Sequence, residues 1–318
     1  MRRMVFLDRG TFSAEIRFAH DTIAGSDWHE YPATRPQDTV SRLRGAEAAV
    51  VNKVCLTAEV LTQLPELKFI ALAATGVDNV DIEAARRQGI AASNVRNYAT
   101  HTVPEHVFAL LLALKRNLLG LRAAACDGRW SASDSFTLQT HAIGDLAGGT
   151  LGIVGAGSLG RAVARIGEAF GMRVVLAEQR NAQTLRSERM AFEQVLAEAD
   201  VVSVHMPLTP ATRNLIGAAE FARMKPGAVL INTARGGVVD EAALLAALKN
   251  GHLGGAGIDV LATEPPPPDH PLLIADLPNL IVTPHVAWAG RQAQQKLADE
   301  VIANIAAFYR GEARNRVA

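Results

Sequence analysis

Three side chains with complementary chemistry follow three predicted strands in the second half of the chain. Arg235, Glu264 and His285 each come shortly after an apolar run typical of a buried strand. Ligands of open parallel sheets bind beyond the carboxyl ends of the strands, so we expect these side chains at one edge. A guanidinium can hold a carboxylate through two hydrogen bonds. An imidazole can move a proton near neutral pH, and a carboxylate can orient it and stabilise its protonated form. This set suits the reduction of a 2-oxo acid by a hydride donor.

A glycine motif predicts where such a donor binds. The sequence GAGSLG at residues 155–160 stands between a predicted strand over 151–154 and a predicted helix over 161–170. A second predicted strand over 172–177 ends at Glu178. The first glycine permits the tight turn, the second the approach of a pyrophosphate, and the third close packing of helix on strand. The helix N-terminus attracts the phosphate charge, and Glu178 is placed to bind the ribose. The pattern therefore predicts a dinucleotide site.

Strands and helices alternate along the whole chain, which favours an α/β fold with two doubly wound parallel-sheet domains. Residues 1–100 are predicted to form the first part of a flavodoxin-like substrate domain. Residues 101–288 are predicted to form a Rossmann-type dinucleotide-binding domain inserted into it, and residues 289–318 a C-terminal helix that returns to the substrate domain. The predicted strands are Val5–Asp8, Ala48–Asn52, Phe69–Ala73, Ile90–Asn94, Leu151–Val154, Met172–Ala177, Val201–His205, Val229–Asn232, Gly257–Val260 and Leu280–Thr283.

A long helix is predicted from Val103, with Thr102 as its N-cap and Pro104 in its first turn. The stretch VFALLLAL is apolar on nearly every face, so this helix is buried either in its own domain or against a second subunit. We favour the subunit interface, because residues 127–147 read as an extended arm that needs a surface to lie on. We expect neither a nucleic acid nor a membrane as partner, because the 318 residues have a formal net charge of zero.

The chain shows no pattern of a targeting or metal-binding segment. The first apolar run, MVFL, is too short for a signal peptide. The longest helical apolar run, residues 107–114, is too short to span a bilayer. Cys55 and Cys126 lie far apart without metal-ligand spacing, so we expect reduced thiols, no metal site and a cytoplasmic protein.

The chain resembles the D-isomer-specific 2-hydroxyacid dehydrogenases along its whole length, and within them the bacterial glycerate dehydrogenases, or hydroxypyruvate reductases. The segments that carry the resemblance are ALAATGVDNVDIEAARRQG, VPEHVFALLLALKRN, TLGIVGAGSLGRAVA, VHMPLTPATRNLIG, MKPGAVLINTARGGVVDEAAL, GAGIDVLATEPP and LIVTPHVAWA. The resemblance implies that Arg235, Glu264 and His285 are catalytic. It implies homodimers formed through the helix from Val103 and the following arm.

The resemblance also assigns binding residues. The substrate would be bound by Asn52, Thr75, Gly76, Val77 and Arg235, with Lys53 and Trp288 contributing to the size and polarity of its pocket. The cofactor would be bound by Gly155, Gly157, Ser158, Leu159, Gly160, Glu178, His205, Pro207, Thr212, Thr233, Ala234, Asp259 and His285. We expect NAD rather than NADP, because the Glu178 carboxylate accepts hydrogen bonds from ribose hydroxyls and repels a 2′-phosphate. Arg180 argues the other way, since it could pair with that phosphate.

Other functions stay open at this point. A glyoxylate reductase would need the same three catalytic groups, and a phosphite dehydrogenase keeps the Glu–His pair. The C-terminal-binding corepressors share these residues yet act mainly as partner-binding scaffolds, so a non-enzymatic NAD-sensing binder is a further alternative. Formate dehydrogenases pair the histidine with glutamine, and Glu264 speaks against them.

Overall fold

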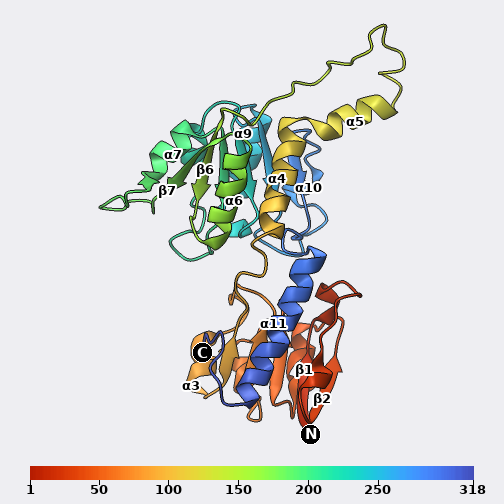
Figure 1. The fold of residues 1–318 in the computed structure, drawn as a ribbon, viewed down its shortest axis with the longest axis vertical. Helices are drawn as coiled ribbons and strands as arrows, with labels where there is room; N and C mark the ends of the chain where they lie inside the picture. Colours follow the sequence, from red (N-terminus) through yellow and green to blue (C-terminus); the bar gives the residue numbers. More distant parts are fainter. The chain divides into compact units, whose positions relative to one another are not determined.

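The computed structural model describes all 318 residues, and the chain divides into two compact units. Unit 1 comprises residues 1–99 and 288–318, and unit 2 comprises residues 100–287. Each unit is built on one parallel sheet with helices packed against it (Figure 1). The predicted α/β fold with two doubly wound parallel sheets is confirmed.

Unit 1 holds a five-stranded sheet in the order β2-β1-β3-β4-β5. Its strands are β1 (Arg2–Phe6), β2 (Ser26–Glu30), β3 (Ala48–Val51), β4 (Phe69–Leu72) and β5 (Ala91–Ser93). Its α-helices are α1 (Thr39–Leu43), α2 (Ala58–Leu61), α3 (Ile82–Arg87) and α11 (Arg291–Tyr309). The strand order reverses between β1 and β3, which makes their carboxyl ends the switch point where ligands of such sheets bind.

The C-terminal helix α11 belongs to the core of unit 1. It packs on β4, and the Phe308 ring stacks on Phe69 with centroids 4.6 Å apart. Asn304, on the buried side of α11, donates a hydrogen bond to the Asn94 carbonyl at 3.0 Å. Apolar side chains of β3 and β4 are buried throughout, as expected for strands covered on both faces.

Unit 2 holds a seven-stranded sheet in the order β12-β11-β10-β9-β6-β7-β8. Its strands are β6 (Thr150–Val154), β7 (Arg173–Ala177), β8 (Arg189–Met190), β9 (Val201–Val204), β10 (Val229–Asn232), β11 (Gly255–Ile258) and β12 (Leu280–Val282). Its α-helices are α4 (Thr102–Lys115), α5 (Leu118–Cys126), α6 (Ser158–Ala169), α7 (Phe192–Glu198), α8 (Ala218–Arg223), α9 (Glu241–Lys249) and α10 (Pro271–Ile274). None of the helices in the chain has the length and apolar character needed to cross a membrane.

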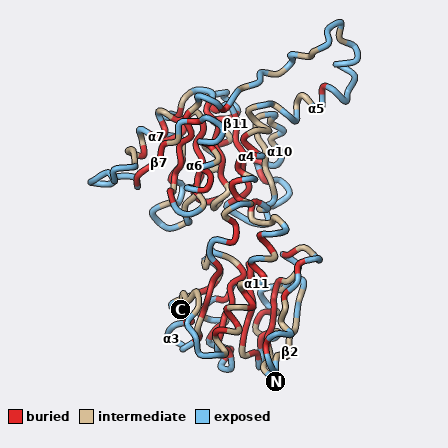
Figure 2. The backbone as a smooth tube through the Cα atoms, in the orientation of Figure 1, coloured by how far each residue is buried: buried red, intermediate tan, exposed pale blue.

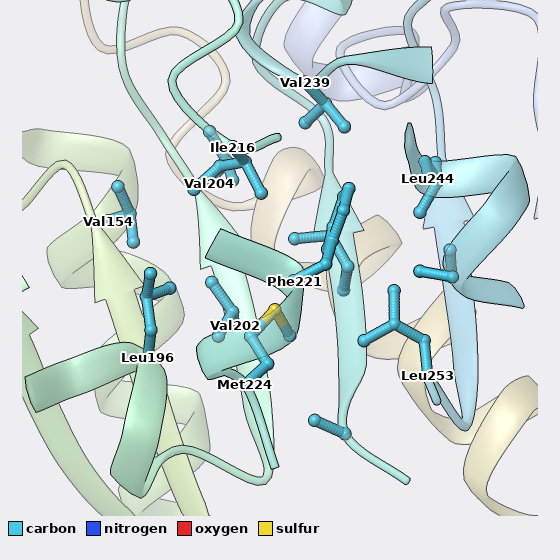
Figure 3. Packing of buried hydrophobic residues seen from close by; sticks show 14 of the residues in the cluster. Val154, Leu196, Val202, Val204, Ile216, Phe221, Met224, Val239, Leu244 and Leu253 are labelled. Atoms are coloured by element: carbon cyan, nitrogen blue, oxygen red, sulfur yellow. The ribbon is translucent and has the colours of Figure 1, made fainter. Parts of the chain in front are cut away.

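A large apolar cluster fills one side of the unit 2 sheet. Figure 3 shows Phe221 and Met224 among sheet residues that include Val202 and Val204. Phe221 is 2% exposed and closes this cluster from the end of α8. Because truncation of such a phenylalanine leaves a cavity, its burial is worth about 3–5 kcal/mol.

Helix α4 covers the other side and corrects one expectation. It begins at Thr102, so Thr102 is not its N-cap; the Thr102 hydroxyl donates instead to the Ala287 carbonyl at 3.3 Å. The helix packs on β10, β11, β12 and α6 within unit 2, and its part in a subunit interface stays a prediction. Gly257 of β11 permits the close approach, because a Cβ there would lie 2.9 Å from the Leu110 Cβ.

The segment after α4 leaves apolar side chains exposed. Helix α5 and the irregular segment that follows it extend away from the rest of unit 2 (Figure 1), and most of that segment is exposed (Figure 2). The exposed apolar residues here are Leu118, Leu119, Trp130, Phe136 and Ile143. We call residues 118–147 the arm; it comprises α5 and the segment 127–147 that was predicted to be extended.

Candidate active site

The glycine motif lies between β6 and α6 and combines two packed positions with one open position. Gly155 has φ +103°, and a Cβ there would overlap the His205 carbonyl. A Cβ at Gly160 would overlap the Gly155 carbonyl, so the third glycine lets α6 pack against the turn. A Cβ at Gly157 would meet nothing within 4 Å. Gly157 and Ser158 are exposed at the start of α6, where backbone N–H groups and the helix dipole favour a phosphate.

His205 stands beside this turn, at the switch point between β6 and β9. Its Nε2 lies 2.8 Å from the Ser203 hydroxyl. Burial lowers the pKa of His205 to about 4, so its imidazole is neutral near pH 7. The neighbouring loop is closed by Thr212, whose hydroxyl donates to the Pro207 carbonyl at 2.7 Å and accepts from the Thr209 N–H.

Glu178 directly follows β7 and is 5% exposed. The Arg186 guanidinium contacts both of its carboxylate oxygens, and the Gln179 N–H donates to Oε1 at 2.8 Å. The Arg186 side chain and the backbone N–H groups of Gln179 and Arg186 lower the pKa of Glu178 to about 2. The carboxylate is therefore ionised at all physiological pH values. Arg180 instead pairs with Glu220, at 2.7 Å. The basic residue on the Glu178 carboxylate is therefore Arg186, which the sequence reasoning missed because no spacing rule connects the two.

Glu264 and His285 contact each other at the edge of the unit 2 sheet. The Nδ1 atom of His285 lies 2.6 Å from Oε2 of Glu264. The Leu261 N–H donates to the other oxygen, Oε1, at 2.9 Å, which fixes the carboxylate in place. With Nδ1 facing a carboxylate, Nε2 is the ring atom suited to exchange a proton with a substrate.

Asp259 accepts hydrogen bonds from residues on both sides of His285. It is 1% exposed, and its Oδ1 accepts hydrogen bonds from the Thr283 hydroxyl at 2.6 Å and the Val286 N–H at 2.9 Å. The Ala287 N–H donates to Oδ2 at 2.8 Å. Burial opposes ionisation, but hydrogen bonds from His106, Thr283 and the backbone outweigh it and lower the pKa of Asp259. His285 itself has φ +54°, a left-handed conformation that this network stabilises.

Arg235 stands in a turn after β10 that is shaped by Asn232. The buried Asn232 side chain donates to the Arg235 carbonyl at 2.9 Å and accepts from the Ala234 N–H at 3.0 Å. The next residue, Gly236, passes so close to Leu261 that a Cβ would overlap its backbone. The loop that carries Arg235 therefore packs directly on the loop that leads to Glu264. The Thr233 hydroxyl in this turn is buried without a hydrogen-bond partner, as expected where a ligand supplies one.

Apart from Arg235, the predicted substrate residues lie in unit 1. Thr75 donates from its hydroxyl to the Val95 carbonyl at 2.7 Å, which fixes the start of the Thr75–Gly76–Val77 loop after β4. Asn52 follows β3 and is buried, with its side-chain N–H₂ bound to the Thr11 hydroxyl at 2.9 Å. Trp288 packs edge-on against Phe12, with ring centroids 5.4 Å apart.

Comparisons with known proteins identify the family of this chain. Residues 108–287 match the family model for the NAD-binding domain of D-isomer-specific 2-hydroxyacid dehydrogenases. The chain is 48% identical to a glycerate dehydrogenase of Methylorubrum extorquens over 99% of both chains. It is 36% identical to a glyoxylate reductase of Korarchaeum cryptofilum, over 96% of this chain and 91% of that one. A solved structure of the TT0316 protein from Thermus thermophilus superposes with a TM-score of 0.88 at 38% identity, over 99% of this chain and 100% of that one.

The chain belongs to the D-isomer-specific 2-hydroxyacid dehydrogenases. It is an oxidoreductase that uses a nicotinamide cofactor and acts on small 2-hydroxy acids, as predicted.

Proposed function

We propose that this enzyme is a glycerate dehydrogenase that reduces hydroxypyruvate with NADH. The contact between His285 and Glu264, 2.6 Å apart beside the Arg235 turn, carries the proposal, because it unites a proton donor with its orienting carboxylate. The likeness to the Methylorubrum glycerate dehydrogenase along nearly the full chain supports the choice of substrate. Glyoxylate is the second substrate we propose, in keeping with the name of the Korarchaeum relative.

The residues of unit 2 fit a nicotinamide dinucleotide. The open position at Gly157 leaves room for a pyrophosphate at the start of α6, and the partnerless hydroxyl of Thr233 fits a ligand at the strand edge. Gly155, Gly157, Ser158, Leu159 and Gly160 would hold the pyrophosphate, and Glu178 the ribose. His205, Pro207, Thr212, Thr233, Ala234 and Asp259 would line the remainder of the cofactor site. When bound, the cofactor supplies the hydride.

The protein's own residues handle the carboxylate and the proton. Arg235 binds the substrate carboxylate through its planar guanidinium. His285 donates the proton from Nε2 to the oxygen that becomes a hydroxyl. Glu264 stabilises the protonated ring before that transfer. In the oxidation direction the neutral ring takes the proton back.

NADH is the proposed cofactor, because Glu178 is ionised and would repel a 2′-phosphate. Arg186 is the residue that could offset this repulsion. We also propose a cytoplasmic homodimer formed through helix α4 and the arm, in which the exposed apolar side chains of the arm are covered by a second copy. Light scattering after size-exclusion chromatography tests the dimer: a Trp130→Ser/Phe136→Ser double variant should elute as a monomer, whereas wild type should not.

Assays with a panel of 2-oxo acids test the function. Hydroxypyruvate should give the highest kcat/KM with NADH, followed by glyoxylate. A tenfold preference for a bulky apolar acid such as phenylpyruvate, or phosphite oxidation faster than every hydroxyacid reaction, would contradict it. A purified protein that binds NADH without turning over any of these acids would point to a non-enzymatic binder.

A further inference from the structure

One carboxylate of unit 2 contacts both ends of the loop that carries Glu264. This loop connects β11 to α10, and Glu241 is the first residue of α9. The Ala262 N–H donates to Oε1 of Glu241 at 2.7 Å. Nε2 of His270 lies 3.2 Å from the other oxygen, Oε2. A single side chain therefore binds the loop before and after Glu264.

The contact with His270 anchors the end of the loop. His270 is buried and caps α10, because its Nδ1 accepts from the Leu272 N–H at 3.3 Å. Nε2 is then the ring nitrogen that carries the hydrogen and donates it to Glu241. Leu272 belongs to the large apolar cluster of unit 2, so this end of the loop is fixed to the core.

The start of the loop is held from two sides. Leu261 belongs to the same apolar cluster, and a Cβ at Gly236 would overlap its backbone, so the turn after β10 packs directly on it. The Leu261 N–H binds Glu264, and the next N–H along the chain, that of Ala262, binds Glu241. Because these two N–H groups are adjacent, a shift of one displaces the other.

Between its two ends the loop is stiff rather than packed. None of the residues 262–269 is buried, so no side chain there anchors the loop in the core. Residues 265–268 are four consecutive prolines, whose rings fix φ at about −65°. Such a segment bends little. The positions of its two ends therefore determine where Glu264 stands.

We propose that Glu241 is a positioning residue for the proton transfer: by binding both ends of the 262–270 loop, it keeps the Glu264 carboxylate on Nδ1 of His285, 2.6 Å away. The inference rests on the proposed function, since it takes Glu264 as the group that orients the proton donor. Glu241 acts through Glu264, so its removal should matter only while Glu264 is present.

A double-mutant cycle tests this dependence. Glu241→Ala should lower the single-turnover rate of hydroxypyruvate reduction about tenfold, because a displaced orienting group costs rate. The Kd for NADH should stay within about twofold, since the glycine motif and Glu178 follow other strands. In a Glu264→Ala background the same change should lower the rate by less than about twofold. A merely structural role would give the same loss in both backgrounds.

Substitutions of His270 separate its contact with Glu241 from its cap on α10. Glutamine places an amide N–H₂ near the position of Nε2 and can still donate to Glu241. Asparagine keeps an acceptor near the position of Nδ1 but is too short for that contact. His270→Gln should retain the rate within about twofold, whereas His270→Asn should lose about fivefold. This pair also tests the inference if Glu241→Ala does not fold.

Asp240→Ala is the matched control for Glu241→Ala. Asp240 is the N-cap of the same helix and accepts from the Ala243 N–H at 3.0 Å, so its removal weakens the start of α9 without freeing the loop. It should lower the melting temperature and leave the single-turnover rate unchanged.

A wild-type rate in Glu241→Ala, or equal losses with and without Glu264, would overturn the inference. Equal rates in His270→Gln and His270→Asn would also overturn it. A Glu264→Ala variant as fast as wild type would instead contradict the role of Glu264 in the proposed function. A wild type that does not reduce hydroxypyruvate would contradict the proposed function itself, and the inference with it.

Discussion

The Nδ1 atom of His285 lies 2.6 Å from Oε2 of Glu264, and the second oxygen of Glu264 is held by the Leu261 N–H. This contact joins side chains from two loops at neighbouring strand ends. It gives the ring a fixed orientation and places a negative charge where the protonated ring gains most from it.

Replacement of Glu264 by Gln should lower the rate of reduction, because the carboxylate that orients the His285 ring before proton transfer is lost. The measurement is kcat/KM for hydroxypyruvate in wild type and variant. His285→Ala should lower kcat/KM by about 10²–10⁴-fold. A Glu264→Gln variant as active as wild type would show that the carboxylate is not needed for the proton transfer.

The glycine motif allows a prediction that separates binding from folding. Gly157→Ala adds a methyl group in open space, so the melting temperature should change little while NADH binding weakens by about tenfold or more, because the methyl occupies the pyrophosphate position. Gly160→Ala places its methyl against the Gly155 carbonyl and should destabilise the free protein. Thermal unfolding without cofactor and NADH titration by fluorescence measure the two effects. A stable Gly157→Ala protein with normal NADH affinity would mean that the pyrophosphate lies elsewhere.

Much of this fold follows from patterns within short windows of sequence. The strand over residues 229–232 has the predicted bounds, because its apolar run and end signals agree there. Strand β2, with the sequence SDWHE, was missed because an edge strand needs no apolar run. Strand β11 begins two residues earlier than predicted, since Gly255 and Gly257 have low strand preference but are required where α4 packs closely.

The residues of the site also fall into two groups, those that the sequence could predict and those that it could not. Arg235, Glu264 and His285 could be found because each follows a strand, and strand ends meet at one edge. The roles of Asn232 and Arg186 could not be predicted, because these side chains bind backbone or carboxylate groups that only the folded loops bring near. Asp259 was predicted at the cofactor, but its place in the network around His285 depends on three contacts that no spacing reveals.

Arg186 should control the tolerance for NADPH. Its guanidinium lies on the Glu178 carboxylate, next to the place proposed for the ribose, so a 2′-phosphate would find its nearest cation there. Arg186→Ala should lower kcat/KM for NADPH by about tenfold while NADH changes less. Arg180→Ala is the matched control, because Arg180 pairs with Glu220 instead. Since the pKa of Glu178 is about 2, the charge of this carboxylate does not change between pH 5 and 9. A larger effect in Arg180→Ala would reverse these roles.

His205 should make the free protein less stable in mild acid. Burial lowers its pKa from 6.5 to about 4, so the unfolded chain binds a proton at pH values where the folded protein does not. Its stabilising effect is complete above pH 6.5 and is lost as pH falls from 6.5 to 4, by at most about 1.4 kcal/mol for each pH unit. His205→Gln should therefore show a shallower loss of unfolding free energy between pH 7 and 4.5 than wild type, measured by urea denaturation without cofactor. His101→Gln, at an exposed histidine, should follow the wild-type curve. Parallel curves for wild type and His205→Gln would mean that His205 titrates in the folded protein as it does in the unfolded chain.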